Sequence, residues 1–244
     1  MDKRVRILLL VGCSLLILLM GCTKETVVSE HHVARKTNLD TKKQVKRKPP
    51  KEVKPLDVPL LNQMDDPRLY NGCEVTSLAM IANYEGYKVT KNELANQLPT
   101  VPLDYENGLK GNPNKGFVGD MVDGPGLTVY HEPIYQLAKE HVSDKAEDVT
   151  GVSTDEIYNY LAKGFPVWVI ITVDYQPTKQ IETWNTPEGK VKTTPRVHSA
   201  VVTGYDEKHI YVNDPYGEKN KKVAKDAFMR AWKQLGRQAI IIKK

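Results

Sequence analysis

Residues 71–80 read Asn-Gly-Cys-Glu-Val-Thr-Ser-Leu-Ala-Met, and the helix that they begin is the element from which the fold can be built. The pattern runs from Cys73 to Glu85 and ends at Gly86. Its apolar positions recur at the spacing of one helical face and consist of Val75, Leu78, Ala79 and Ala82. We therefore expect an amphipathic helix with Cys73 at its N-terminus and outside the apolar stripe.

Periodicity along the rest of the chain predicts helices first and antiparallel strands later, which is the order of an α+β fold. A near-continuous β-branched and aromatic run at 166–173 is typical of a buried strand. Further helices are expected at 91–98, 134–141, 154–162 and 225–234. Further strands are expected at 56–61, 198–205, 209–213 and 238–242, the first at a sheet edge because of its internal proline.

The segment 107–126 interrupts these elements. Eleven of its twenty residues are Gly, Pro or Asn, so it is too irregular for a helix or strand and too long for a simple connection. We expect a functional loop that borders a binding cleft.

The composition of the 244 residues excludes several classes of protein. Three cysteines exclude a disulfide-stapled mini-protein and a four-thiolate zinc site. The sequence contains no GxxxxGK[ST] loop and no GxGxxG before a helix, so nucleotide chemistry has no support. The net charge of +5 divides into +2 for residues 1–21, +6 for 23–55 and −3 for 56–244. A slightly acidic body does not have the electrostatic footprint of a nucleic-acid binder.

The first 22 residues have the organisation of an export signal. A cationic start is followed by an apolar run from Ile7 to Met20. As a helix this run reaches about 21 Å, short of a bilayer core of about 30 Å, as expected for a signal peptide. It ends in Leu-Met-Gly-Cys22, which resembles the bacterial lipobox. That resemblance implies that Cys22 becomes the N-terminus and carries acyl chains such as palmitate, the alternative being an ordinary secretory signal.

Residues 23–55 follow as a basic segment rich in Lys, Arg, Glu and Thr. With almost no clustered aliphatic side chains, this segment cannot bury enough apolar surface to offset the entropy of ordering, so we expect a disordered tether. Its basic run at 46–51 suits anionic lipid headgroups, and a merely solubilising spacer fits equally well. The adjacent His31 and His32 have no further ligand nearby and do not predict a metal site.

Of the three cysteines, only Cys73 is expected to keep a free thiol. Cys13 is removed with the signal and Cys22 is used by the lipid anchor, so Cys73 is left as the only free thiol of an exported body. Such a thiol is either a small buried apolar side chain or a nucleophile. Its place favours the nucleophile, because the N–H groups and dipole at a helix N-terminus stabilise a thiolate. Gly72 also leaves the approach to the sulfur open.

A thiolate nucleophile needs a base, and the base needs a group that orients it. Among the histidines of the body, His198 differs because it opens a strand that is expected to enter the core. The next strand ends at Asp214, within the sequence Asn-Asp-Pro. An ordinary turn is the alternative interpretation of these three residues.

The loop between the two strands decides whether these two side chains meet. A three-residue loop pairs Tyr205 with His209 and makes Asp214 a diagonal neighbour of His198 on the same face of the sheet. A two-residue turn would place them on opposite faces. With the three-residue loop, Asp214 is expected to orient one imidazole nitrogen and to leave the other for Cys73.

With these three residues in this order, residues 56–244 resemble the papain-like cysteine peptidases. The resemblance is closest to the peptidase-like domain of family C thirty-nine, related to the bacteriocin-leader peptidases. It implies a papain-like fold, in which an N-terminal helical part with the nucleophile helix packs on an antiparallel β-sheet. The stretches that carry it occur in order and are 58–63 (Val-Pro-Leu-Leu-Asn-Gln), 71–80, 164–167 (Gly-Phe-Pro-Val), 198–206 (His-Ser-Ala-Val-Val-Thr-Gly-Tyr-Asp) and 211–215 (Tyr-Val-Asn-Asp-Pro).

The resemblance implies Cys73 as nucleophile, His198 as general base and acid, and Asp214 as the residue that orients the imidazole. It also implies that Gln63 donates a side-chain N–H to an oxyanion hole together with the Cys73 backbone N–H. A surface amide at the end of a strand is the alternative for Gln63. The implied activity is that of a membrane-tethered, extracytoplasmic cysteine peptidase that cleaves a peptide or isopeptide bond through an acyl-thioester intermediate.

Two features depart from the family pattern. Leader peptidases of this family sit in ABC exporters, whereas this sequence shows neither a membrane domain nor an ATPase. Glu74 stands where many members have a small residue, and its negative charge opposes formation of a thiolate. Two other functions therefore stay open: an inactive peptide- or cell-wall-binding module on the same fold, and a transglutaminase-like acyltransferase.

The expected partners are a peptide or protein substrate and the membrane, which is reached through the lipidated Cys22 and the basic tether. We expect a monomer on the extracytoplasmic face of the bacterial cell membrane. No cofactor, no metal and no nucleic acid are expected.

Overall fold

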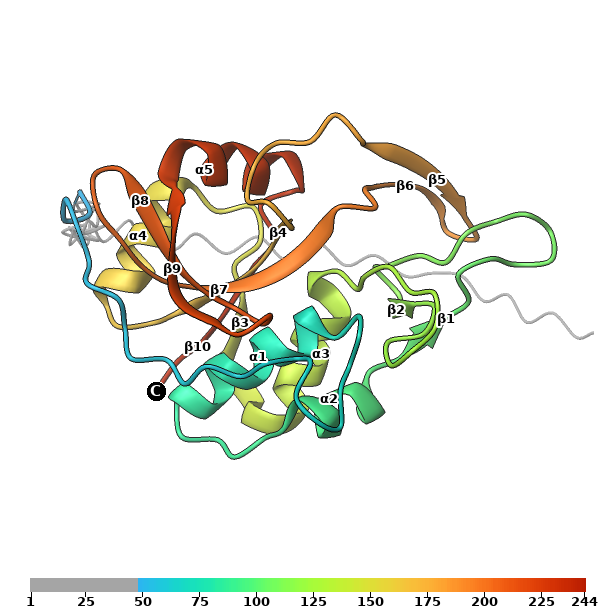
Figure 1. Ribbon diagram of the computed structural model, residues 1–244, viewed down its shortest axis with the longest axis horizontal. Helices are drawn as coiled ribbons and strands as arrows, with labels where there is room; N and C mark the ends of the chain where they lie inside the picture. Colours follow the sequence, from blue (N-terminus) through green and yellow to red (C-terminus); the bar gives the residue numbers. More distant parts are fainter. Residues whose placement is uncertain (1–47) are drawn as a thin grey trace, which may run out of the picture. The chain divides into compact units, whose positions relative to one another are not determined.

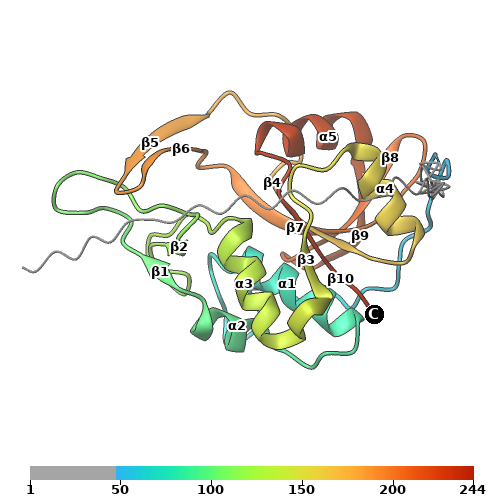
Figure 2. The ribbon, with the colours of Figure 1, turned by 180° about the vertical axis from the view of Figure 1, so that it is seen from behind.

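The computed structural model describes residues 48–244, in which a six-stranded antiparallel sheet has helices on both faces (Figures 1 and 2). The α+β fold is therefore confirmed. The order in the sheet is β3-β10-β4-β7-β8-β9. Its strands are β3 (Ala146–Asp148), β4 (Val167–Thr172), β7 (Val197–Tyr205), β8 (His209–Asp214), β9 (Glu218–Ala224) and β10 (Ala239–Ile242).

The remaining elements pack around this sheet or extend from it. Two small two-stranded sheets are formed by β1 (Thr100–Val101) with β2 (Phe117–Val118) and by β5 (Glu182–Thr186) with β6 (Gly189–Thr193). The helices are α1 (Cys73–Tyr84), α2 (Lys91–Gln97), α3 (His131–Val142), α4 (Thr154–Ala162) and α5 (Lys225–Gln234), with a 3-10 turn at Ser143–Lys145. None of these described helices is long and apolar enough to cross a bilayer.

The predictions for the N-terminal part of the chain lie outside the described residues. They comprise the signal peptide, the lipidated Cys22, the histidine pair of the tether and the tether itself up to residue 47.

Two apolar cores lie on the two faces of the sheet. All six residues of β4 are buried, and their side chains alternate between the cores. Trp168 and Ile170 join the core that contains the apolar side chains of α1, whereas Val167, Val169 and Ile171 join the core that contains those of α5. This two-sided burial explains why β4 reads as a continuous apolar run and not as an alternating one.

Helix α1 is buried around its whole circumference, not along one face. Every residue from Cys73 to Ala82 is buried, because the helix packs against β4 and β7 on one side and against α2 and α3 on the other. The predicted helix is therefore confirmed, but its expected exposed face is not. The hydroxyl groups of Thr76 and Ser77 have no hydrogen-bond partner, which is a cost of this complete burial.

The predicted edge strand at 56–61 is not formed. Val53 makes an isolated antiparallel bridge with Tyr205 instead. Pro55 and Pro59 lack the N–H groups that a continuous ladder needs, so the chain runs along the end of β7 without forming a strand. These contacts begin three residues before the predicted start of the domain at 56, within the last part of the predicted tether.

Several short strands could not be predicted from periodicity. Strands β3, β5, β6 and β9 are rich in polar or charged residues and bury few of them. By contrast, α4 and α5 have the predicted bounds. Helix α3 begins three residues earlier than expected, at His131.

The β7–β8 hairpin contains a register shift that the sequence analysis missed. Tyr205 pairs with Ile210 and not with His209, so the loop has four residues instead of the predicted three. A one-residue bulge then returns the pairing to the predicted register, in which Val202 faces Val212. The far end of the hairpin, where the candidate site residues lie, is therefore aligned as predicted.

Gly204 lies beside this bulge, where the N-terminal segment crosses β7. A Cβ atom at Gly204 would stand 2.6 Å from the Val53 carbonyl oxygen and 2.9 Å from the Pro55 nitrogen. The lack of a side chain thus allows Val53 to pair with Tyr205. The Tyr205 hydroxyl holds the segment further by donating to the Pro50 carbonyl oxygen at 2.6 Å.

Gly204→Ala is expected to push the 50–55 segment away from β7. The free energy of unfolding should fall by about 1–3 kcal/mol, as is typical when a methyl group is forced into a tight contact. Urea unfolding measures the loss, and limited proteolysis should cut the variant faster before residue 56. The penalty should shrink in a chain that begins at residue 56, and an equal penalty in both chains would exclude the steric explanation.

Candidate active site

The four predicted site residues come from four parts of the chain and lie in one region. Cys73 is the first residue of α1, His198 the second residue of β7, and Asp214 the last residue of β8. Gln63 belongs to the segment before α1, and its backbone N–H donates to the Pro215 carbonyl oxygen at 2.7 Å. All four side chains are buried.

His198 and Asp214 form a buried pair. The distance from His198 Nε2 to Asp214 Oδ1 is 3.0 Å. The corrected register explains the contact, because Val201 faces Asn213 and Asp214 is thereby placed diagonally across from His198, as predicted. The contact uses one imidazole nitrogen and leaves Nδ1 for another partner.

Asp214 is surrounded by further donors. Its Oδ1 also accepts from the Tyr216 backbone N–H at 3.0 Å, and its Oδ2 accepts from the Tyr175 hydroxyl at 2.7 Å and from Lys221 Nζ at 3.4 Å. Burial alone would raise the pKa of this carboxyl, but the hydrogen bond and charge of His198 together with these donors hold it well below its ordinary value. Asp214 is therefore an anion that can orient the imidazole.

Two tyrosines that the sequence analysis missed frame the imidazole. The ring of Tyr216 stacks on His198 with centroids 5.3 Å apart, and 51% of this residue is exposed. Tyr175 meets His198 edge-on at 6.2 Å and is buried. Tyr216 could have been noticed because it follows Asn-Asp-Pro, whereas Tyr175 lies in a turn with no distinguishing sequence pattern.

The Cys73 thiol is enclosed, with only 8% of the residue accessible. Its Sγ donates to Glu74 Oε2 at 3.3 Å, and the backbone N–H of Ser199 donates to the sulfur. Because Ser199 directly follows His198, the sulfur lies beside the strand that carries the imidazole. The thiol hydrogen bond, however, goes to Glu74 and not to His198.

The electrostatic surroundings of the sulfur differ from those expected at a helix N-terminus. Burial raises the pKa of the Cys73 thiol well above its ordinary value, and the Glu74 carboxylate raises it further. The backbone N–H groups of Ser199 and Cys73 act in the opposite sense without compensating. The expected thiolate is therefore not favoured in this geometry, and the effect of Glu74 on the pKa of the thiol has the expected direction.

The Gln63 side chain is buried, and both of its amide hydrogens bond to backbone carbonyl oxygens. Its Nε2 donates to the Tyr70 carbonyl oxygen at 2.9 Å and to the Leu69 carbonyl oxygen at 3.3 Å. Its Oε1 is buried without a partner. Gln63 is thus not the surface amide that was the alternative, and its role as an oxyanion donor stays a prediction.

Part of the predicted 107–126 loop forms a wall next to helix α1. The Asn71 side chain donates to the carbonyl oxygens of Asp120 at 2.8 Å and Gly124 at 3.1 Å. The backbone N–H of Asn71 donates to the Met121 carbonyl oxygen at 2.9 Å. These bonds fix the segment 120–124 beside the two residues that precede Cys73.

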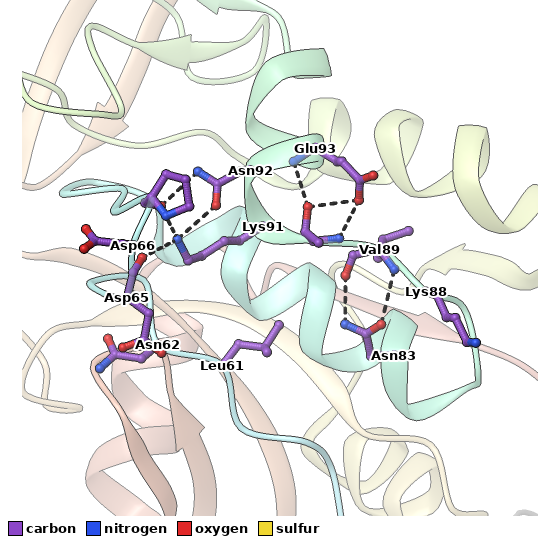
Figure 3. A pocket seen from close by; sticks show the side chains of 12 residues that line it. Leu61, Asn62, Asp65, Asp66, Asn83, Lys88, Val89, Lys91, Asn92 and Glu93 are labelled. Atoms are coloured by element: carbon purple, nitrogen blue, oxygen red, sulfur yellow. Dashed lines mark hydrogen bonds between the residues drawn. The ribbon is translucent and has the colours of Figure 1, made fainter.

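Lys91 ties the Gln63 segment to helix α2. Figure 3 shows this side chain pointing from α2 toward residues 65–67, at the edge of a cavity of about 640 Å³. Its Nζ donates to the carbonyl oxygens of Asp65 at 2.8 Å and Pro67 at 2.5 Å, and to Asn92 Oδ1 at 3.1 Å. Burial lowers the pKa of this ammonium group, so its position depends on those three acceptors.

Residues 48–244 contain no cluster of three or more His, Cys, Asp or Glu side chains arranged to hold a metal ion. The titratable groups gathered at the site are the Cys73 thiol, the His198 imidazole and the carboxyl groups of Asp214 and Glu74.

The fold and this order of residues define a class of protein. A cysteine begins a helix that packs on an antiparallel sheet, and the sheet supplies first a histidine and then an aspartate from adjacent strands. This is the fold of a C39-like peptidase.

Comparison with known proteins identifies the family within this class. The sequence pattern of the Peptidase_C39 like family matches residues 55–240, and the chain belongs to this family. The Bacillus subtilis (strain 168) protein YvpB, itself uncharacterized, is 61% identical over 191 residues, which cover 78% of this chain and 76% of YvpB.

Two solved structures are similar to the chain. A proposed C39-like peptidase from Bacillus anthracis superposes with a TM-score of 0.76 at 39% identity, covering 80% of this chain and 98% of that protein. Xylellain, a cysteine protease from Xylella fastidiosa, is far more distant, with a TM-score of 0.45 at 14% identity over 80% of this chain and 87% of its own.

Lys91→Met is expected to loosen the segment that carries Gln63. The change keeps the length of the side chain but leaves buried carbonyl oxygens without a donor, so the free energy of unfolding should fall by about 1–3 kcal/mol. Denaturant unfolding measures the loss. Lys88→Met is the matched control, because Lys88 lines the same cavity but is exposed. Equal effects of both changes would refute the role assigned to Lys91.

Proposed function

We propose that this protein is a cysteine peptidase that cleaves a peptide or isopeptide bond through an acyl-thioester intermediate. The observation that carries the proposal is the buried His198–Asp214 pair, joined at 3.0 Å, on the strand beside the Cys73 sulfur. An imidazole held at one nitrogen by a carboxylate can exchange a proton with a thiol at the other. Membership of the C39-like family supports the same assignment.

In the first half of the proposed reaction, the Cys73 thiol gives its proton to Nδ1 of His198 and the sulfur attacks the carbonyl carbon of the scissile bond. The tetrahedral intermediate collapses as the imidazolium protonates the leaving amine, and the acyl group stays on the sulfur as a thioester. In the second half, His198 removes a proton from water, whose oxygen attacks the thioester. The acid leaves and the thiol is restored, while Asp214 keeps the imidazole oriented.

Stabilisation of the oxyanion requires a small rearrangement of Gln63. One amide hydrogen must leave the Leu69 carbonyl oxygen, the longer of the two contacts at 3.3 Å. The 2.9 Å contact with the Tyr70 carbonyl oxygen can hold the amide during this change. The backbone N–H of Cys73 is the second donor, and losing one such donor typically costs about 3–4 kcal/mol in the barrier.

A second function has a specific observation in its favour. The raised pKa of the Cys73 thiol and its hydrogen bond to Glu74 suit a peptide- or cell-wall-binding module that does not turn over. A transglutaminase-like acyltransferase would use the same three residues and would differ only in the amine that accepts the acyl group from the thioester.

The proposed peptidase acts on a peptide or protein substrate outside the bacterial cell membrane. The lipobox-like sequence at Cys22 supports a lipid anchor, and the basic segment that follows supports additional contact with anionic lipid. The −3 charge of residues 56–244 argues against nucleic acid as a partner. Residues 48–244 include their own two apolar cores, which is consistent with a monomer.

Cys73→Ala is expected to abolish hydrolysis of a peptide library, because the variant has no nucleophile, and to prevent labelling by a thiol-directed probe at this position. His198→Ala should slow hydrolysis by at least about 10²-fold, the lower end of what a general base contributes. Mass spectrometry of the cleaved peptides measures both effects.

His209→Ala is the matched control for the histidine variant. His209 is also paired with an aspartate, Asp206 at 3.1 Å, but it lies at the opposite end of β8 from Asp214. Hydrolysis that survives Cys73→Ala would exclude the proposed nucleophile. Tight binding of a peptide by Cys73→Ala without turnover by the wild type would identify a binding module, and incorporation of an amine would identify acyl transfer.

Cys22→Ser is expected to move the protein from the membrane fraction to the soluble fraction, because only two acyl chains give stable anchoring. Fractionation in high salt measures the change and removes the contribution of the basic tether. Cys13→Ser is the matched control, since Cys13 would be lost with the signal peptide. A wild-type protein that is soluble in high salt would refute the lipid anchor.

A further inference from the structure

Glu74 is a buried carboxylate that touches the candidate nucleophile and has no part in the reaction proposed above. None of its surface is accessible. Its Oε2 accepts from the Cys73 thiol at 3.3 Å, and its Oε1 accepts from the Thr128 hydroxyl at 2.5 Å and from the Val129 backbone N–H at 3.3 Å. A carboxylate this far from water depends on its partners, and the thiol is one of three.

The titratable groups around this pair supply little positive charge. Tyr130 interacts with Glu74, and Tyr175 and Tyr216 interact with Cys73. His198 and Lys221 are the basic side chains of the cluster, and both are bonded to Asp214, at 3.0 and 3.4 Å. Apart from these two groups bound to Asp214, the neighbouring titratable side chains that interact with the Cys73–Glu74 pair are the three tyrosines.

We propose that Glu74 is a positioning residue that holds the thiol proton of Cys73 and keeps the nucleophile in a neutral resting form. The inference rests on the proposed function, because it assigns a resting state to the same site. In that state the S–H group donates to the Glu74 carboxylate. Reaction begins when the S–H turns from Glu74 to His198, which accepts the proton and leaves a thiolate, while Glu74 stays bonded to Thr128 and Val129.

The short distance between the Cys73 sulfur and the Glu74 carboxylate is the reason why Glu74 keeps the thiol neutral. A thiolate 3.3 Å from an ionised carboxylate would place two negative charges side by side in a buried site, where charges interact much more strongly than in water. Burial and the neighbouring carboxylate both raise the pKa of the thiol. Reactivity of the free protein should therefore increase with pH only across the alkaline range.

Glu74→Gln tests the proposal because it removes the charge and keeps the size of the side chain. The rate of alkylation of Cys73 by iodoacetamide is followed from neutral to alkaline pH on the full chain, by mass spectrometry of the peptide that contains Cys73. The midpoint is expected to fall by at least one pH unit, which gives about tenfold faster alkylation at neutral pH. Asp57→Asn is the matched control, since Asp57 is an exposed carboxylate bonded to Lys219, and it should leave the midpoint unchanged.

An unchanged or slower alkylation in Glu74→Gln would overturn the proposal. The test needs no substrate, so a wild type that fails to hydrolyse peptides would refute the proposed peptidase and leave this inference standing. Infrared spectroscopy of the wild type keeps the proposal testable if Glu74→Gln does not fold. The S–H band of Cys73, assigned by its loss in Cys73→Ala, should persist above the ordinary thiol pKa of about 8.5, and its absence at neutral pH would contradict the resting thiol.

Discussion

A single extra residue in β7 determines whether the candidate site can form. Side chains alternate between the faces of a sheet, so a shift of one residue moves every side chain to the opposite face. The four-residue loop after Tyr205 introduces such a shift, and the bulge between Val202 and Gly204 cancels it before the strand reaches His198. Asp214 is therefore on the face from which it can bond to the imidazole at 3.0 Å. Gly204, beside the same bulge, lies against the N-terminal segment at residues 53–55. The packing of that segment and the geometry of the candidate site therefore both depend on this part of β7.

The sequence could predict the elements whose residue pattern reflects burial. It also predicted the contact between His198 and Asp214, because the predicted strand register is correct on the side of the bulge where these two residues lie. Helix α4 was predictable because its apolar side chains face the core and the Ser153 hydroxyl caps its first turn. Strand β9 was not, because five of its seven residues are charged or amide side chains and its place is set by pairing with β8. The enclosure of Cys73 was also not predictable, since burial at a helix N-terminus depends on segments far away in the sequence.

Two buried carboxyl groups in one site show how hydrogen-bond partners decide whether the pKa of a group is raised or lowered. Asp214 is bonded to an imidazole that can carry a positive charge, and its pKa is lowered in spite of burial. Glu74 is bonded to a hydroxyl, a backbone N–H and a thiol, all neutral, and burial raises its pKa. Neighbouring charge therefore outweighs desolvation for Asp214, whereas desolvation prevails for Glu74. The sequence contains both residues but does not reveal this difference, because it depends on which donors surround each carboxylate.

Glu74 also connects Cys73 to the wall of the candidate site. The segment that contacts Asn71 through the carbonyl oxygens of Asp120 and Gly124 continues to Thr128 and Val129, which bond to Glu74. The ten residues 120–129 thus contact both Asn71, just before Cys73, and the side chain of Glu74, immediately after it. A displacement of this stretch would change the donors on the Glu74 carboxylate, and with them the acceptor that holds the thiol proton.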